Sequence, residues 1–150
     1  MDLNQLIEQL DNNISNANLI NQSISLRGVD WHIDHSLKVI IGVNKILIKS
    51  EEKDYNWKFN FIRTVCLTLA YFPKGKGKAP KVVNNEEDIQ IDDLKKQLKL
   101  VKELLANKSK LKPKSNFNHP YFGLLNLKQS QRFLAVHTQH HLKIIDEIVG

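Results

Sequence analysis

The sequence contains only one cysteine, Cys66, in 150 residues. A single thiol cannot build an internal disulfide framework, so the fold must be stabilised by a hydrophobic core. Apolar residues make up 41% of the chain, which is sufficient for such a core at this length. We therefore expect one domain spanning residues 1–150, in a reducing compartment, the cytoplasm.

Long apolar runs are also missing. No run approaches the ~20 residues that a membrane-spanning helix requires. The N-terminal stretch MDLNQLIEQLDNN is amphipathic and mixes acidic with apolar residues, unlike a secretory signal. These absences predict a soluble protein that does not associate with membranes.

Strand patterns are missing as well. No stretch alternates with period two for long enough to be a strand, whereas apolar residues recur at helical spacing in five segments. The second helix should open at Asp30 as N-cap and be buried on most sides, and the fifth should open at Asn126 with Gln129 in capping-box position. An all-α bundle is therefore expected. Its helices cover about residues 3–17, 31–49, 54–71, 88–107 and 126–149.

The third expected helix carries Cys66 in its apolar stripe, which favours an inert core residue over a nucleophile. That stripe consists of Phe61, Ile62, Val65, Cys66 and Leu69.

Positive charge exceeds negative charge, with a formal net charge of +6. We find no helix-turn-helix and no aromatic residues interleaved with the basic runs, so a nucleic-acid partner is not expected. The loop PKGKGKAPK carries Lys74, Lys76 and Lys78 between glycines that allow main-chain N–H groups to approach an anion. A solvated loop with no ligand is the alternative.

Histidines are concentrated in the stretch LAVHTQHHLKII, residues 134–145. His137 and His141 are four residues apart and project from one helix face. They lie in the apolar stripe of that helix, where a leucine could be buried without a hydrogen-bond partner and an imidazole could not. Two histidines one turn apart form a standard half-site for a divalent metal ion. His140 falls at the edge of that face.

A third ligand is offered by the second expected helix, in WHIDHSLK. If the second and fifth helices are neighbours, His35 can converge with His137 and His141, whereas His32 is about 60° from His35 and nearer the helix start. Three neutral imidazoles would leave a coordination position open for water or substrate. The alternative is a set of buried histidines bonded to main-chain carbonyls.

Three stretches resemble a known family. HPYFGLLNLKQSQRFLAVHTQHHLKII (119–145) is similar to the C-terminal signature of the DinB-like, damage-inducible four-helix-bundle superfamily, in a branch described as a domain of unknown function. VDWHIDHSLKVIIGVNKIL (29–47) resembles that branch's helix with an aromatic residue before a ligand histidine, and PKGKGKAPKVV (73–83) resembles its Gly-Lys-Ala-Pro loop. The likeness covers about residues 29–145.

The resemblance implies an up-down-down-up bundle, here with an additional helix and long Lys/Gly/Pro loops. It also implies a metal held by His35, His137 and His141. Superfamily members with known activity include thiol-dependent S-transferases, which use bacillithiol or mycothiol, and a maleylpyruvate isomerase.

The residues and the resemblance together suggest a metal-dependent enzyme, with thiol S-transfer or hydrolysis as its reaction. Zn²⁺, Ni²⁺ and Fe²⁺ all suit imidazole ligands, and each can activate a water or a thiol. Trp31 and Phe133 are candidates to wall the pocket. Asp34, His140 and His119 are candidate residues behind the ligands or proton carriers, although His119 also suits a turn.

Two other functions stay open. A non-enzymatic helical binding protein would have a structural metal or none. A dimeric scaffold would pair through helix faces, and we expect a homodimer because the second helix is apolar on more than one side.

Overall fold

The computed structural model describes residues 2–72, 88–107 and 110–150. This part of the chain is mostly helical, which confirms the all-α prediction. The elements, in chain order, are α1 (Leu3–Asn12), the 3-10 turn η1 (Asn13–Asn16), α2 (Val29–Lys49), the 3-10 turn η2 (Glu52–Asp54), α3 (Phe61–Leu69), α4 (Ile91–Ala106), β1 (Asn116–His119), β2 (Gly123–Asn126) and α5 (Leu127–Val149).

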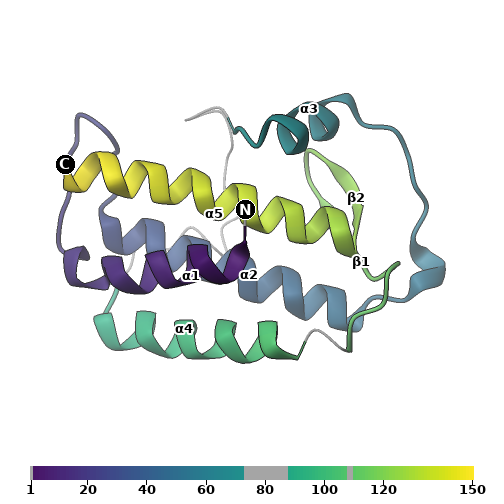
Figure 1. Ribbon diagram of the computed structural model, residues 1–150, viewed down its shortest axis with the longest axis horizontal. Helices are drawn as coiled ribbons and strands as arrows, with labels where there is room; N and C mark the ends of the chain where they lie inside the picture. Colours follow the sequence, from purple (N-terminus) through teal and green to yellow (C-terminus); the bar gives the residue numbers. More distant parts are fainter. Residues whose placement is uncertain (1, 73–87, 108–109) are drawn as a thin grey trace.

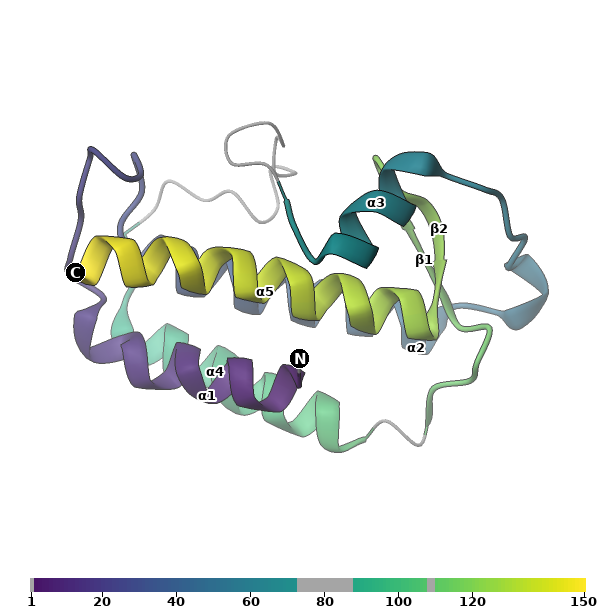
Figure 2. The same cartoon turned by 45° about the horizontal axis from the view of Figure 1, so that its top comes forward.

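Four helices lie along one another. α2 packs against α4 and α5, and α1 packs against α5 and α4. α1 and α5 run in one direction, and α2 and α4 run in the opposite direction (Figure 1). α3 and the strands lie on the far side of α5 from α1 and α4 (Figure 2). The two helices that carry the predicted metal ligands, α2 and α5, are therefore neighbours.

Among the described helices, none is both long and apolar enough to cross a bilayer.

The core follows the helical periodicity of the sequence. Each fully buried leucine or isoleucine side chain contributes roughly 1.5–3 kcal/mol by leaving water. The predicted stripes of the first and fourth helices are buried except at Ile91, which is 48% exposed. The buried positions are Leu3, Leu6, Ile7, Leu10, Ile14, Ala17, Leu94, Leu98, Val101 and Leu105.

α2 begins earlier than predicted, and Asp30 is not its N-cap. The cap is Gly28, and the helix starts at Val29. The main-chain N–H groups of Val29 and Asp30 donate to the carbonyls of Leu19 and Ala17, at 3.0 and 3.1 Å. Because the preceding loop satisfies these donors, the helix needs no side-chain cap at that point.

The third helix differs most from the prediction. It spans nine residues, and the chain before it is extended apart from η2. Its apolar stripe faces solvent, with Phe61 70%, Ile62 56% and Leu69 68% exposed. The expectation that this stripe is core was therefore wrong for these three residues, whereas Cys66 on the same stripe is partly buried against the core.

A buried arginine explains the orientation of α3. Arg63 is 4% exposed, and its guanidinium donates to the carbonyls of Phe122 at 3.3 Å, Leu124 at 3.2 Å and Lys58. The face of α3 that carries Arg63 therefore meets the strands, and the opposite face points outward. Burying a charge without such bonds would cost several kcal/mol, so these contacts fix the rotation of the helix.

The prediction that the chain has no strands was also wrong. β1 and β2 form an antiparallel hairpin in which Phe117 pairs with Leu125. Each strand has four residues, too few for a period-two pattern to stand out. Gly123 has a φ of +67°, a value that favours glycine, at the start of β2.

α5 begins as predicted. The side chain of Asn126 accepts from the N–H of Gln129, and the Gln129 side chain accepts from the N–H of Asn126. Asn126 is also the last residue of β2, so α5 starts directly at the end of the hairpin and continues to Val149.

Candidate metal centre

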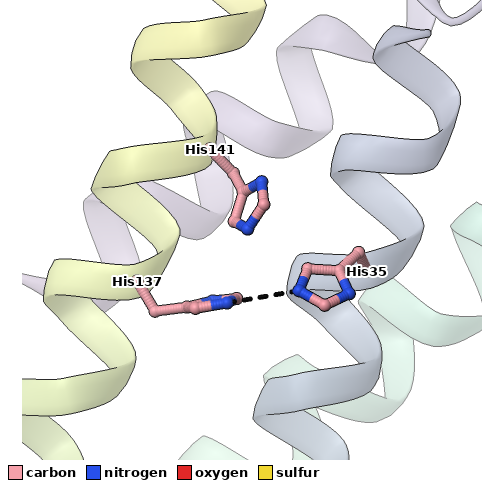
Figure 3. A group of neighbouring side chains, drawn as sticks. All are labelled: His35, His137 and His141. Atoms are coloured by element: carbon pink, nitrogen blue, oxygen red, sulfur yellow. Dashed lines mark hydrogen bonds between the residues drawn. The ribbon is translucent and has the colours of Figure 1, made fainter. Parts of the chain in front are cut away.

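Three histidines from two helices meet between those helices. His35 lies on α2, and His137 and His141 lie one turn apart on α5. Each offers one ring nitrogen, and these three atoms all lie within 4.8 Å of one another. Figure 3 shows the three rings gathered between the two helices. They are close enough to hold one metal ion.

The distance between two of the rings provides a test of fit. The Nε2 atoms of His35 and His137 are 3.3 Å apart. Two imidazole nitrogens bound at ~2.0–2.1 Å to one tetrahedral ion lie roughly 3.3–3.4 Å apart, so this pair has the separation that a shared ion requires. In the absence of an ion, the same contact is a hydrogen bond in which one ring donates to the other.

The third ring also presents a nitrogen to this point. The Nδ1 atom of His141 lies 2.9 Å from Nδ1 of His32. In Figure 3, one nitrogen of His141 is directed at His35 and His137, and the other points away from them. The nitrogen that faces the other two ligands is therefore Nε2, which makes the candidate donor set three Nε2 atoms.

Burial favours the neutral imidazoles that a metal ion requires. Loss of hydration holds the pKa of His137 well below 6.5, and the neighbouring His35 and His140 lower it further. Burial likewise holds the pKa of His141 well below its usual value, with His137 and His35 adding to the effect. A ring that is already neutral binds a metal without first losing a proton.

Two buried polar atoms beside the histidines have no hydrogen-bond partner among the described residues. They are Nδ1 of His137 and the indole nitrogen of Trp31. Leaving a buried polar atom unpaired costs roughly 1–3 kcal/mol. Such atoms are rare in folded proteins, but Nδ1 of His137 is not the nitrogen that faces His35, so its lack of a partner concerns the back of that ring and not the ligand position.

The two predicted wall residues lie against the ligand rings. Trp31 stacks on His35 with ring centroids 4.7 Å apart and planes 7° apart, and Phe133 lies 5.5 Å from the His137 ring. Trp31 also lines an open surface depression of about 340 Å³ together with Arg27, and none of the three histidines lines that depression.

Asp34 lies elsewhere. Its carboxylate accepts from Lys38 at 2.7 Å and from Gln97 of α4 at 2.8 Å. These contacts tie α2 to α4, and they direct the carboxylate to the α4 side of α2.

His140 and His119 flank the site. His140 contacts the rings of His141 and Phe72, at centroid distances of 5.3 and 6.2 Å. His119 is a turn residue, because its Nδ1 accepts from the N–H groups of Tyr121 and Phe122, both at 3.2 Å.

Lys74, Lys76 and Lys78 lie outside the described residues. Cys66 is partly buried against the core, and burial raises the pKa of its thiol, which makes it a weaker nucleophile at neutral pH.

His32 was not among the predicted site residues, but it lies directly behind His141. It is 3% exposed, and burial lowers its pKa to about 4, reinforced by His35 and His140. The spacing of His32 and His35 could have indicated this position, because residues three apart are neighbours on a helix and His35 was a predicted ligand.

Comparison with known proteins found no matching protein family, curated protein or solved structure. The functional interpretation of the site therefore rests on its residues.

Proposed function

We propose that this protein is a metal-dependent enzyme that holds one divalent ion on His35, His137 and His141. The observation that carries the proposal is the meeting of three imidazole nitrogens from two helices within 4.8 Å. Structural zinc sites are closed by four protein ligands, whereas three leave a position for substrate or water. Zn²⁺, Ni²⁺ and Fe²⁺ all accept this donor set.

The ion, when bound, supplies Lewis acidity that brings the pKa of a water or a thiol toward neutrality. The protein supplies the rest. The low pKa values of His137 and His141 keep both rings available as ligands at neutral pH. Trp31 and Phe133 pack against the ligand rings and keep bulk water away, which strengthens electrostatic interactions at the site.

We further propose that the fold is a DinB-like four-helix bundle, with α1, α2, α4 and α5 running up, down, down and up. The directions of these helices in Figure 1 support this proposal, as do the positions of the histidines on α2 and α5. α3 and the hairpin are then additions to the bundle. Within that family likeness, thiol S-transfer with a low-molecular-weight thiol is the favoured reaction, and hydrolysis is the alternative.

An activity screen tests the enzyme proposal. Protein loaded with Zn²⁺, Ni²⁺ or Fe²⁺ is assayed with bacillithiol or mycothiol and an electrophilic acceptor, and separately with ester substrates. We expect one combination to turn over, and removing the metal or replacing His35 by alanine should return the rate to background. A rate that is the same in metal-free protein would contradict the proposal.

One observation favours a second candidate, a non-enzymatic binding or scaffold protein that forms a homodimer. The apolar face of α3 and the segment before it expose Trp57 59%, Phe59 66%, Phe61 70% and Leu69 68%. Large apolar side chains exposed at several positions of one segment favour an interaction site there.

We expect the protein to elute in sizing chromatography at twice the mass of one chain. The double replacement Phe61→Glu and Leu69→Glu should give a monomer, because it places charges in the apolar contact. Ile48→Glu, on the exposed side of α2, is the matched control and should leave the dimer intact. If only Ile48→Glu dissociates the dimer, the contact between the two chains lies on α2 and not on α3.

A further inference from the structure

A fourth histidine lies behind the candidate metal ligands. His32, on the first turn of α2, and His141, on α5, place their Nδ1 atoms 2.9 Å apart, and the two residues are 3% and 7% exposed. A contact this short between two imidazole nitrogens is a hydrogen bond, which requires one nitrogen to donate and the other to accept.

The contact continues beyond His32. The other ring nitrogen of His32, Nε2, lies 3.0 Å from Oγ of Ser25, in the loop before α2. The same Oγ accepts from the main-chain N–H of Arg27 at 3.1 Å. Ser25, His32 and His141 therefore form one chain of hydrogen bonds that ends at a candidate ligand.

This chain has two self-consistent proton arrangements. In the first, His141 donates from Nδ1 to Nδ1 of His32, and His32 donates from Nε2 to Ser25. In the second, every donor and acceptor is reversed, and His141 carries its proton on Nε2. Only the first leaves Nε2 of His141 free of a proton, and Nε2 is the atom that faces His35 and His137.

We propose that His32 is a positioning residue for the metal centre, which accepts the Nδ1–H of His141 and is itself held by Ser25. His32 thereby selects the tautomer of His141 that can bind an ion and fixes the orientation of its ring. The proposal rests on the proposed metal site, and it assigns His32 no direct bond to the metal. Partners of this kind commonly contribute a factor of ~10–100 in metal affinity.

Two substitutions at position 32 separate this role from the alternatives. His32→Asn keeps an acceptor at the same place, because Oδ1 of asparagine and Nδ1 of histidine are bonded to the same side-chain carbon. His32→Phe keeps an aromatic ring and removes the acceptor. Zn²⁺ affinity is measured by competition with a chromophoric chelator, and folding is checked by circular dichroism.

We expect His32→Phe to bind Zn²⁺ roughly 10–100-fold more weakly than the wild type, and His32→Asn to stay within about threefold. Equal affinity of wild type and His32→Phe would overturn the proposal. Equal weakening by both variants would make His32 a ligand or a packing residue, which also overturns it. If the wild type itself binds no Zn²⁺, the proposed function fails, and that result is distinct from variants that bind as the wild type does.

The wild-type protein provides an independent readout that needs no variant to fold. In the Zn²⁺-loaded, ¹⁵N-labelled protein, the imidazole nitrogens of His141 and His32 report their tautomers by NMR. We expect a proton on Nδ1 of His141 and a proton on Nε2 of His32. A proton on Nδ1 of His32 would exclude it as the acceptor.

Discussion

Replacing His137 by alanine should abolish stoichiometric metal binding. His137 supplies one of three ligands, and its Nε2 atom lies 3.3 Å from that of His35. Loss of a residue behind a ligand costs ~10–100-fold in metal affinity, so loss of the ligand itself should exceed ~100-fold. Elemental analysis of protein purified without an affinity tag measures the effect. We expect about one metal per chain in the wild type and a trace in His137→Ala.

A neighbouring residue of the same type is the control. His140→Ala, three positions further along α5, should retain the metal because its ring is not in the group of three. Equal loss in both variants would show that the wrong face of α5 was chosen. His35→Ala tests the contribution of α2, and unchanged metal content in that variant would mean that the two helices do not share an ion.

Acidification should strongly destabilise the metal-free protein. Burial lowers the pKa values of His32 and His119 to about 4, and holds those of His137 and His141 well below 6.5. Below pH 6.5 the unfolded chain takes up protons that the folded protein excludes, so the free energy of unfolding falls with pH until the folded-state pKa is reached. Above pH 6.5 the full stabilisation from the neutral histidines is present. His32 and His119 lose their contribution to the free energy of unfolding between pH 6.5 and about 4, and His137 and His141 continue to lose theirs at lower pH.

The size of this effect can be measured by urea unfolding with a chelator present, at pH 7.5 and pH 4.5. A histidine whose pKa falls from 6.5 to about 4 contributes at most ~3 kcal/mol, and less where its ring keeps part of its hydration, as in His119. Summed over the four rings, we expect a loss of several kcal/mol. Stability that is unchanged or greater at pH 4.5 would contradict the burial of these rings.

A substitution at His119 tests the contribution of one ring. His119→Asn retains an acceptor for the N–H groups of Tyr121 and Phe122 and removes the titrating group. We expect this variant to fold at pH 7.5 and to lose less stability on acidification than the wild type.

The sequence predicted α5 and the histidines on it well, because those features are local. A capping box at Asn126 and Gln129 fixes the first turn, and a spacing of four residues places His137 and His141 on one face whatever surrounds the helix. The third ligand, His35, required the further assumption that α2 and α5 are neighbours. That assumption came from the seam-facing histidines, and the contacts between the two helices bear it out.

Prediction was poorest where tertiary contacts override periodicity. The stripe of α3 has the spacing of a buried helix, but one arginine determines which face is covered. Arg63 finds its acceptors on the hairpin residues Phe122 and Leu124, about sixty positions away. Helical spacing carries no information about such a partner. The hairpin itself was missed because four-residue strands are too short to show alternation.

The neighbours of the metal ligands were only partly predictable. Trp31 precedes His35 by one turn, so its stacking on that ring follows from helix geometry. The direction of Asp34 toward Gln97 depends on the position of α4, and the link from His32 to His141 depends on the separation of α2 and α5. Neither can be read from one helix alone.

The most direct measurement is zinc-edge X-ray absorption of the wild-type protein loaded with one equivalent of Zn²⁺. If the three histidines share an ion, the first shell contains nitrogen or oxygen at ~2.0–2.1 Å, and the outer-shell scattering fits three imidazoles. His140→Ala should give the same spectrum. A first shell with one imidazole or none, or protein that releases Zn²⁺ on desalting, would contradict the central claim that α2 and α5 build one metal site.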